Sequence, residues 1–325
     1  MTTTYRKLTW PLFLELIRLP AKAASLLPFL FGVSYAWLAY GQLDWLNTAV
    51  YFVGQMSIAL FVTGFNNVQD FYKAQDDHYR ATQNILGREH LNPRRIMALM
   101  LTFLAIACLA GVVLVWRTDL ALLLIGGAGI FVAVFYTFGP VPLSRLPSGE
   151  VLAGLCEGFG TILIAVFVNV TPRPVTLVMT SRTFALALDA AQLLRLLLVA
   201  LPIVLLDAAT MFADNICDLD QDIRNQRFTL PYYLGRARAL AVYPWLPAAA
   251  FAAIGVGVAA RVLPWPTILV WALWPLAHRN THRFLTHPSK QATFITAIHT
   301  MLTTFGAEVL VLIVLGVLAR WVKVW

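Results

Sequence analysis

Residues 190–222 read AAQLLRLLLVALPIVLLDAATMFADNICDLDQD. The part up to position 212 is almost wholly apolar, and a helix of that length crosses a hydrocarbon core of about 30 Å. Four aspartates then follow, at positions 214, 218, 220 and 222. Because an aspartate at the centre of a membrane helix costs on the order of 2.5 to 3.5 kcal/mol, this cluster belongs at a membrane face, beside water or a cation.

Apolar runs of similar length recur along the chain of 325 residues, which is 59% hydrophobic, has a mean hydropathy of +0.73 and is only 12% charged. A soluble domain would carry about a quarter charged residues. We therefore predict an all-α polytopic membrane protein with nine transmembrane helices, and a single domain over 1–325 in which 1–20 form an interfacial amphipathic segment. The nine predicted spans are 21–40, 46–66, 95–116, 120–138, 150–170, 190–212, 239–260, 264–278 and 293–318.

The distribution of basic residues predicts the orientation. Lys and Arg concentrate before the first span and in the connections after the second, fourth, sixth and eighth spans, which places the N-terminus in the cytoplasm and the C-terminus outside a plasma membrane. The formal charge of +8 is explained in this way, and the chain shows no basic run interleaved with aromatics that would indicate nucleic-acid binding. Its three scattered cysteines predict neither a disulfide framework nor a zinc site.

A second acidic stretch, NNVQDFYKAQDD at 66–77, follows the second span. On a helix Asn66 and Asp70 share a face, and continuing the same helical phase favours Asp77 over Asp76 as a third member. In the later stretch Asp214, Asp218 and Asp222 share a face, and Asp207 extends it into the membrane.

Stacked carboxylates repel one another unless a cation lies among them. Mg2+ fits best, because it prefers carboxylate oxygen and keeps positions open for water and phosphate. Basic residues follow both stretches, Lys73 and Arg80 in the first and Arg224 and Arg227 in the second, as expected for a site that holds a metal-bound polyanion. Either stretch alone would also fit an ordinary solvated helix end; two matching stretches at one face favour the metal site.

Both stretches resemble motifs of the UbiA-type superfamily of intramembrane prenyltransferases. The first is similar to the family's NDxxDxxxxxD through Asn66, Asp70 and Asp76, with Asn67 where the family usually has Asp. The second is similar to NNxRDxxxDxxxGKRTLxxxLG, with Asp214 in place of the leading Asn; its matching residues are Asn215, Asp218, Asp222, Arg227, Thr229, Leu230 and Gly235.

Two further segments extend the resemblance, and the first of them points to the 1,4-dihydroxy-2-naphthoate prenyltransferase branch. YTFGPVPLSRLPSGE, from Tyr136 to Glu150, resembles the branch's YxxGPxPLxxxxxGE connection. RLPAKAASLLPFLFG resembles the family's RPKTLPASVAPVLLG and supplies Arg18 and Lys22. The similarity extends over almost the whole chain.

The resemblance implies a helical bundle around a central cavity open to the cytoplasmic side, in which a polyprenyl diphosphate alkylates 1,4-dihydroxy-2-naphthoate with loss of carbon dioxide, giving a demethylmenaquinol. Mg2+ is the implied cofactor and the lipid bilayer the medium; the oligomeric state stays open. The expected catalytic residues are Asn66, Asp70, Asp218 and Asp222, and the expected metal ligands are Asn66, Asp70, Asp76, Asp77, Asp214, Asp218 and Asp222. The expected diphosphate contacts are Arg18, Lys22, Lys73, Arg80, Tyr136, Arg224 and Arg227, and the expected acceptor contacts are Glu150, Glu157 and Asn215.

Several alternatives stay open at this point. The third member of the first cluster is Asp76 by the motif and Asp77 by helical phase. Tyr136 fits equally well as an aromatic of the interfacial belt. The same acidic motifs would serve an enzyme with another acceptor, such as 4-hydroxybenzoate, and carboxylates in a membrane protein also serve transporters as ion sites. The spacing of His278 and His282 permits metal binding, but the flanking arginines favour a solvated loop.

Overall fold

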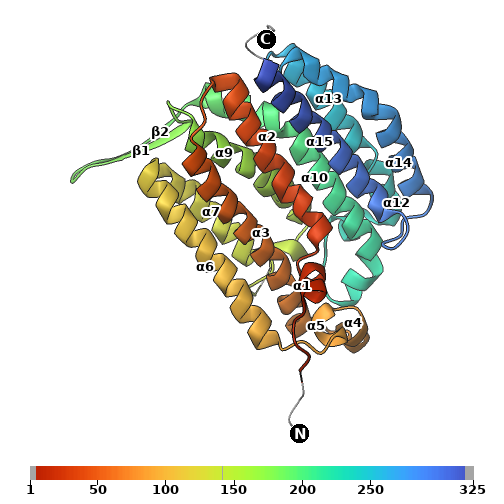
Figure 1. The fold of residues 1–325 in the computed structure, drawn as a ribbon. Coiled ribbons are helices and arrows are strands. Elements are labelled where there is room, and N and C mark those ends of the chain that lie inside the picture. Colours follow the sequence, from red (N-terminus) through yellow and green to blue (C-terminus); the bar gives the residue numbers. More distant parts are fainter. Residues whose placement is uncertain (1–4, 141, 319–325) are drawn as a thin grey trace.

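A computed structural model describes residues 5–140 and 142–318 of the chain. Helices make up most of it, and the long ones pack side by side into one bundle (Figure 1). The α-helices are α1 (Trp10–Leu16), α2 (Ala23–Tyr40), α3 (Trp45–Lys73), α4 (Asp77–Thr82), α5 (Ile85–Arg88), α6 (Pro93–Arg117), α7 (Ala121–Phe135), α8 (Gly149–Ala153), α9 (Thr161–Asn169), α10 (Ala190–Arg224), α11 (Leu230–Leu234), α12 (Arg236–Val242), α13 (Trp245–Ala259), α14 (Trp274–Thr286) and α15 (Phe294–Leu318). Short 3-10 segments cover Leu19–Lys22, Leu143–Arg145 and Trp265–Leu273, and Gly154–Gly160 is a π-helix.

Seven helical segments in the described part of the chain are long and apolar enough to cross a membrane, which confirms the prediction of a multi-pass helical membrane protein. They are Leu19–Tyr40, Trp45–Lys73, Pro93–Arg117, Gly149–Asn169, Ala190–Arg224, Arg236–Ala259 and Phe294–Leu318. The two other predicted spans coincide with shorter elements. Span 120–138 contains α7, of 15 residues, and span 264–278 contains a 3-10 segment that leads into α14.

Two helices continue well past the predicted spans. The helix α3 has 29 residues and ends at Lys73, and α10 has 35 residues and ends at Arg224. Because about 20 residues suffice to cross the hydrocarbon core, the last turns of both helices extend beyond it. Both acidic stretches lie in or directly after these extra turns. Both α3 and α10 terminate at the same end of the bundle, and we refer to this end as the acidic end.

The helix α10 lies at the centre of the packing, where it contacts α13, α15 and the π-helix and lies beside α15 in Figure 1. The π-helix approaches α10 closely because two glycines face it. A Cβ atom added to Gly154 would lie 2.5 Å from the carbonyl oxygen of Val204, and one added to Gly158 would lie 2.9 Å from the Val204 side chain. These glycines allow the segment 149–160 to pack directly on α10.

An apolar cluster supports α10 near the acidic end. Phe212 and Ile216 of α10 are fully buried and belong to one cluster with Tyr243 and Phe284. The rings of Tyr243 and Phe284 lie 4.7 Å apart between centroids. The carboxylates of the second acidic stretch therefore project from a rigid helix whose other face is packed.

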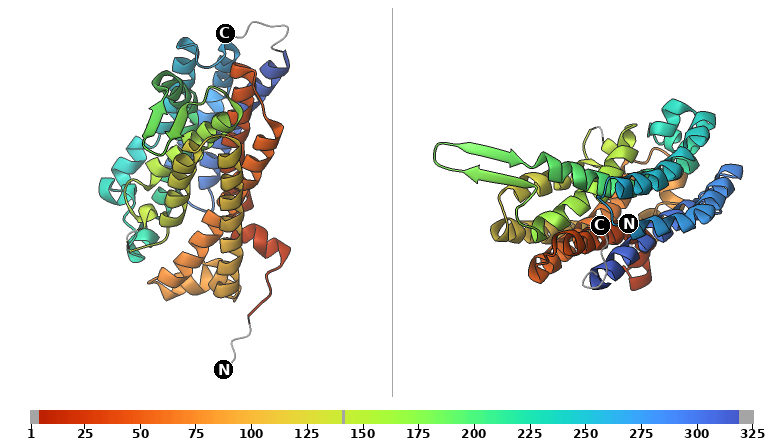
Figure 2. Two further views of the ribbon diagram at one scale, coloured as in Figure 1. Left: turned by 90° about the vertical axis from the view of Figure 1, so that its left-hand side faces the viewer. Right: turned by 90° about the horizontal axis from the view of Figure 1, so that it is seen from above.

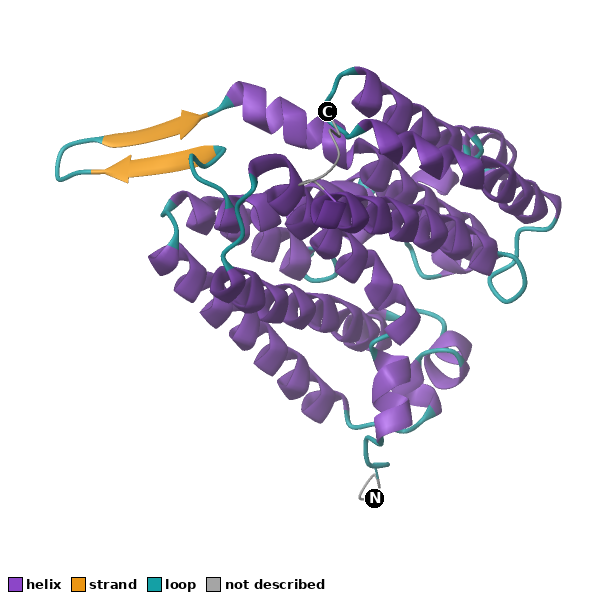
Figure 3. Ribbon diagram, turned by 45° about the horizontal axis from the view of Figure 1, so that its top comes forward, coloured by secondary structure: helices purple, strands orange, loops and turns teal. Residues whose placement is uncertain are grey.

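A β-hairpin between α9 and α10 was not predicted from the sequence, where 171–189 was read as a connection. Strands β1 (Val175–Met179) and β2 (Phe184–Leu188) pair in antiparallel register, with Val175 opposite Leu188. The hairpin extends away from the bundle at the end opposite α4 and α5 (Figures 2 and 3). It therefore takes no part in the acidic end.

Candidate active site

The two acidic stretches meet at one small cavity at the acidic end. Asp70, from the last turn of α3, and Asp222, from the last turn of α10, both line it. The remaining lining residues are Ala74, Tyr79, Arg145, Gln221, Asn225 and Arg227. The cavity has a volume of only about 20 Å3, roughly the room of one water molecule. Carboxylates separated by about 150 positions in the sequence thus line one small polar cavity.

The first acidic stretch is helical only as far as Lys73. Within the helix the predicted pair forms, because the Asn66 side-chain amide donates to Asp70 Oδ2 at 3.1 Å. Beyond Ala74 the chain leaves the helix, and Asp76 becomes the N-cap of α4, accepting from the backbone N–H groups of His78 and Tyr79 at 2.9 and 3.2 Å.

The helical-phase argument for Asp77 fails for this reason, since no continuous helix joins it to Asp70. The Asp77 carboxylate is 89% exposed and pairs with Arg80 at 3.0 Å. The Asp76 carboxylate is 24% exposed and lies 3.7 Å from Arg224 of the second stretch. Of the two alternatives, Asp76 is the one that the structure brings against the second motif.

Three of the four carboxylates on the predicted face of α10 have a cationic neighbour; the fourth, Asp207, is buried and its Oδ2 atom has no hydrogen-bond partner in the described part of the chain. Asp222 is 5% exposed and lies 3.6 Å from Arg227. Its Oδ2 atom is buried and has no hydrogen-bond partner in the described part of the chain. Asp214 and Asp218 both accept from the Nζ atom of Lys290, at 2.5 and 2.6 Å.

Lys290 was not identified as a site residue from the sequence, where it counted only as one of the basic residues of the last connection. It lies 72 positions after Asp218, and no local pattern joins the two. Burial lowers the pKa of Lys290, but the adjacent carboxylates of Asp214 and Asp218 outweigh burial and hold the pKa above its ordinary value. The group is therefore an ammonium ion at neutral pH.

Two guanidinium groups face the shared cavity. Burial lowers the pKa of Arg227, but Asp222 and Asp70 outweigh this and keep the pKa above its ordinary value. Burial and the charge of Arg227 together lower the pKa of Arg145, whose side chain also donates to the carbonyl of Asn225 at 3.4 Å. The mutual repulsion of two arginines at one cavity is relieved by an anion that binds both.

The other predicted diphosphate contacts are not part of the lining of the cavity. Lys73 donates to the carbonyls of Thr137 and Gly139, both at 3.1 Å, and Arg80 donates to the carbonyl of Ala74 at 2.5 Å. Arg224 is 61% exposed beside Asp76, and Arg18 has a left-handed backbone at the start of the 3-10 turn. Lys22 donates to Ala59 and Thr63 of α3.

Two of the three predicted acceptor contacts, Glu150 and Asn215, form a buried pair. The amide of Asn215 donates to Glu150 Oε1 at 2.8 Å, and Glu150 is only 2% exposed. Glu157 lies on the π-helix and its Oε2 atom has no hydrogen-bond partner among the residues that the structure describes. Tyr136 reaches toward the segment just before the π-helix, with its hydroxyl 3.4 Å from the carbonyl of Gly149.

The residues around the cavity suit a hard divalent cation in donor type. Carboxylate and amide oxygens are provided by Asn66, Asp70 and Asp222, and the unpartnered Oδ2 of Asp222 is the kind of buried acceptor that a cation satisfies. Within 5–140 and 142–318 no three His, Cys, Asp or Glu side chains gather closely enough to form a metal centre by themselves.

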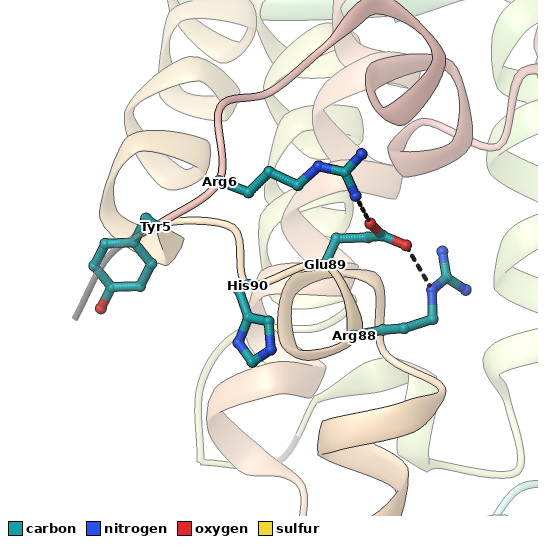
Figure 4. A pocket seen from close by; sticks show the side chains of 5 residues that line it. All are labelled: Tyr5, Arg6, Arg88, Glu89 and His90. Carbon is teal, nitrogen blue, oxygen red and sulfur yellow. Dashed lines mark hydrogen bonds and ion pairs between the residues drawn. The ribbon is translucent and has the colours of Figure 1, made fainter.

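A larger hollow of about 360 Å3 lies elsewhere, between the N-terminal segment and α5, and contains none of the predicted site residues (Figure 4). It is lined by Tyr5, Arg6, Arg88, Glu89 and His90. Glu89 forms ion pairs with Arg6 and Arg88, so this region ties the N-terminus to the segment after α4.

The comparisons with known proteins agree with this fold. The UbiA prenyltransferase family profile matches residues 25–303, so the chain belongs to that family and is a prenyltransferase. It is 27% identical over 257 residues to 1,4-dihydroxy-2-naphthoate octaprenyltransferase of Bacillus subtilis, covering 77% of this chain and 75% of that protein. It is 28% identical over 216 residues to the enzyme of the same name from Mycobacterium tuberculosis, covering 65% and 68%. These relatives belong to the branch that the sequence motifs indicated.

Solved structures share the fold. A UbiA homolog from Archaeoglobus fulgidus bound to GPP and Mg2+ superposes with a TM-score of 0.58 at 13% identity, covering 93% of this chain and 99% of that one. A UbiA homolog from Aeropyrum pernix K1 gives a TM-score of 0.63 at 19% identity, covering 88% and 97%.

Proposed function

We propose that this protein transfers a polyprenyl group from a polyprenyl diphosphate to 1,4-dihydroxy-2-naphthoate in a Mg2+-dependent reaction that releases carbon dioxide and gives a demethylmenaquinol. The observation that carries the proposal is the meeting of Asp70 and Asp222 at one cavity with Arg145 and Arg227. The naphthoate-specific relatives and the motif from Tyr136 to Glu150 support the choice of acceptor.

Asn66, Asp70 and Asp222 would hold the cation, with Asp76 at the edge of the site. When bound, Mg2+ neutralises the diphosphate and makes it a better leaving group. The arginines donate charge-assisted hydrogen bonds to the phosphate oxygens, and Arg227 already lies beside Asp222. The cavity has about the volume of one water, so a diphosphate needs more room than this structure provides there.

The bond between the allylic carbon and the diphosphate oxygen then breaks, and the departing electron pair stays on the diphosphate. The electron-rich naphthoate ring attacks the allylic cation through the carbon that carries the carboxylate. Loss of carbon dioxide returns the electron pair to the ring, so the carboxylate itself balances the charge and no protein base is required. The buried group of Glu150 and Asn215 would orient the acceptor through its hydroxyl groups.

The proposal includes the topology of the whole chain. We infer a single domain of nine spans in a plasma membrane, with the N-terminus and the acidic end on the cytoplasmic side, the C-terminus outside, and the central cavity opening to the cytoplasm. The basic residues around the acidic end support this orientation, because Lys and Arg are retained on the cytoplasmic face.

The test is a reconstituted reaction. Detergent-purified protein is incubated with Mg2+, dihydroxynaphthoate and a polyprenyl diphosphate, and the prenylated quinol and released diphosphate are measured by mass spectrometry and a phosphate assay. We expect both products, and neither after chelation of the metal. Product from 4-hydroxybenzoate but not from dihydroxynaphthoate would overturn the acceptor; absence of diphosphate release with either acceptor would overturn the proposed reaction.

A further inference from the structure

Lys290 joins the second acidic motif from a distant part of the chain. It lies in the connection between α14 and α15, and its ammonium group bridges Asp214 and Asp218, which are one helical turn apart on α10. The Lys290 side chain is 31% exposed, and the two carboxylates are 19% and 27% exposed. This is a partly buried, two-point ion pair, which is stronger than a solvated surface pair.

The connection around Lys290 is a built turn. The backbone N–H of Ser289 donates to the Thr293 hydroxyl at 2.9 Å, and that hydroxyl donates to the carbonyl of His287 at 2.7 Å. Phe294 closes the turn through its backbone N–H, and its ring lies 5.1 Å from the Lys290 ammonium. Thr293 is 6% exposed. The lysine is thus held over α10 by a defined loop.

The ammonium occupies the oxygen atoms that the sequence motif assigns to a cation. Asp214 and Asp218 direct one oxygen each at the same Nζ atom, whereas Asp222 keeps an oxygen without a partner in the described part of the chain. An ammonium and a divalent cation compete for the same carboxylate oxygens. A lysine also has a flexible four-carbon stem and three donors, so it can exchange one anionic partner for another without movement of the backbone.

We propose that Lys290 is the resident counter-ion of the second acidic motif. Before substrate arrives, its ammonium group pairs with Asp214 and Asp218. When these carboxylates accept a divalent cation, the ammonium group moves to a diphosphate oxygen and pairs with it instead. The inference rests on the proposed function for the identity of the anion. The consequence is that cation and diphosphate bind cooperatively. The diphosphate draws the ammonium group away from the carboxylates that the cation needs, and the cation occupies the carboxylates that would otherwise hold the ammonium group.

Cation binding without substrate tests the inference directly. Purified full-length protein in detergent is titrated with Mn2+, and free Mn2+ is measured by electron paramagnetic resonance. The variants are Lys290→Met, Lys290→Gln and, as a matched control that removes one exposed positive charge, Lys7→Met. Without diphosphate we expect both Lys290 variants to bind Mn2+ about tenfold more tightly than wild type, because a hydrogen bond to a charged group is worth roughly 1.5 kcal/mol or more. The control should match wild type.

The same titration is repeated with a non-hydrolysable polyprenyl thiolodiphosphate. We expect the analogue to increase Mn2+ affinity in wild type by a larger factor than in Lys290→Met. Unchanged or weaker Mn2+ binding by both Lys290 variants in the absence of the analogue would overturn the inference. If that result comes with normal formation of the prenylated quinol by wild type, the inference fails alone; if the Lys290 variants bind more tightly but wild type forms no quinol, the proposed function fails and the counter-ion role stands.

Discussion

The side-chain oxygen of Asn225 lies 3.2 Å from the backbone nitrogen of Gln75, which fastens the segment after the second acidic motif to the segment after the first. The same oxygen lies 3.4 Å from the backbone nitrogen of Asp76, and the Asn225 amide donates to the carbonyl of Gln221 at 3.1 Å. Asn225 is only 6% exposed. One side chain therefore links the ends of α3 and α10 beside the cavity they share.

Replacing Asn225 with Ala should separate the two motifs. Two backbone N–H groups lose their acceptor, so we expect the free energy of unfolding to fall by about 1 to 2 kcal/mol and kcat/KM for the polyprenyl diphosphate to fall by about tenfold. Thermal unfolding in detergent and steady-state kinetics provide the measurements. Equal kinetics for the Ala variant and wild type would show that the link is dispensable.

The carboxylates of the two acidic motifs should be essential for turnover. We expect Asp70→Ala, Asp218→Ala and Asp222→Ala each to lose activity by about 100-fold or more, while the proteins still insert and fold, because each removes an oxygen that balances the positive charge of the site. Asp→Asn changes should be nearly as damaging, since the amide keeps the shape and loses the charge. Quinol formation is the readout, and monodispersity in detergent is the folding control. Wild-type rates in any of the three would remove that residue from the site.

The alternative between Asp76 and Asp77 leads to a direct comparison. Asp76→Ala removes the N-cap of α4 and the neighbour of Arg224, so we expect about 1 kcal/mol of destabilisation together with weaker diphosphate binding. Asp77→Ala removes a carboxylate that is 89% exposed and should change both quantities little. The KM for the polyprenyl diphosphate and the thermal stability of both variants decide which aspartate belongs to the site. A larger loss of activity in Asp77→Ala than in Asp76→Ala would show that it is Asp77.

The sequence predicted the helical parts of the site better than the parts that follow the helices. The pairing of Asn66 with Asp70 and the common face of Asp214 and Asp218 follow from a periodicity that both helices keep. The end of α3 at Lys73 does not follow from it, because Ala74 and Gln75 are not helix breakers. Contacts with Asn225 and the cap at Asp76 accompany that end, and of these only Asp76 as an N-cap has a local signal.

Long-range contacts and exposed segments also escaped prediction. Lys290 meets Asp218 through a tertiary contact, and a single lysine in a basic connection carries no sign of its partner. The hairpin β1–β2 has alternating small and large apolar residues, FALAL in β2, but a short apolar run beside membrane helices does not distinguish a strand from a connection.

Tyr79 provides a prediction about pH. Burial, and then the negative charge of Asp70, raise the pKa of this phenol to about 12 from its ordinary value near 10. A raised pKa in an acid favours its neutral form, so the Tyr79 hydroxyl stays protonated throughout pH 7 to 10 and cannot serve as a base there. We expect wild type and Tyr79→Phe to give parallel profiles of kcat/KM against pH over that range. A limb near pH 10 that is present in wild type and absent in Tyr79→Phe would contradict this.

Asn67 takes the place of an aspartate in the motif that the first acidic stretch resembles, and its contacts predict that a change to aspartate is harmful. Its amide donates to the carbonyl of Leu16 at 2.9 Å and to that of Thr63 at 3.2 Å, and Asn67 is 9% exposed. An ionised carboxylate has no hydrogen to donate and would face two carbonyl oxygens, so Asn67→Asp should lower the free energy of unfolding by about 1 to 3 kcal/mol and loosen α1 from α3. Thermal unfolding and limited proteolysis near the N-terminus measure the two effects. Because the change adds a carboxylate next to Asn66, tighter Mn2+ binding without loss of stability would instead show that Asn67 is a replaced metal ligand, and that result would contradict the structural role assigned to it here.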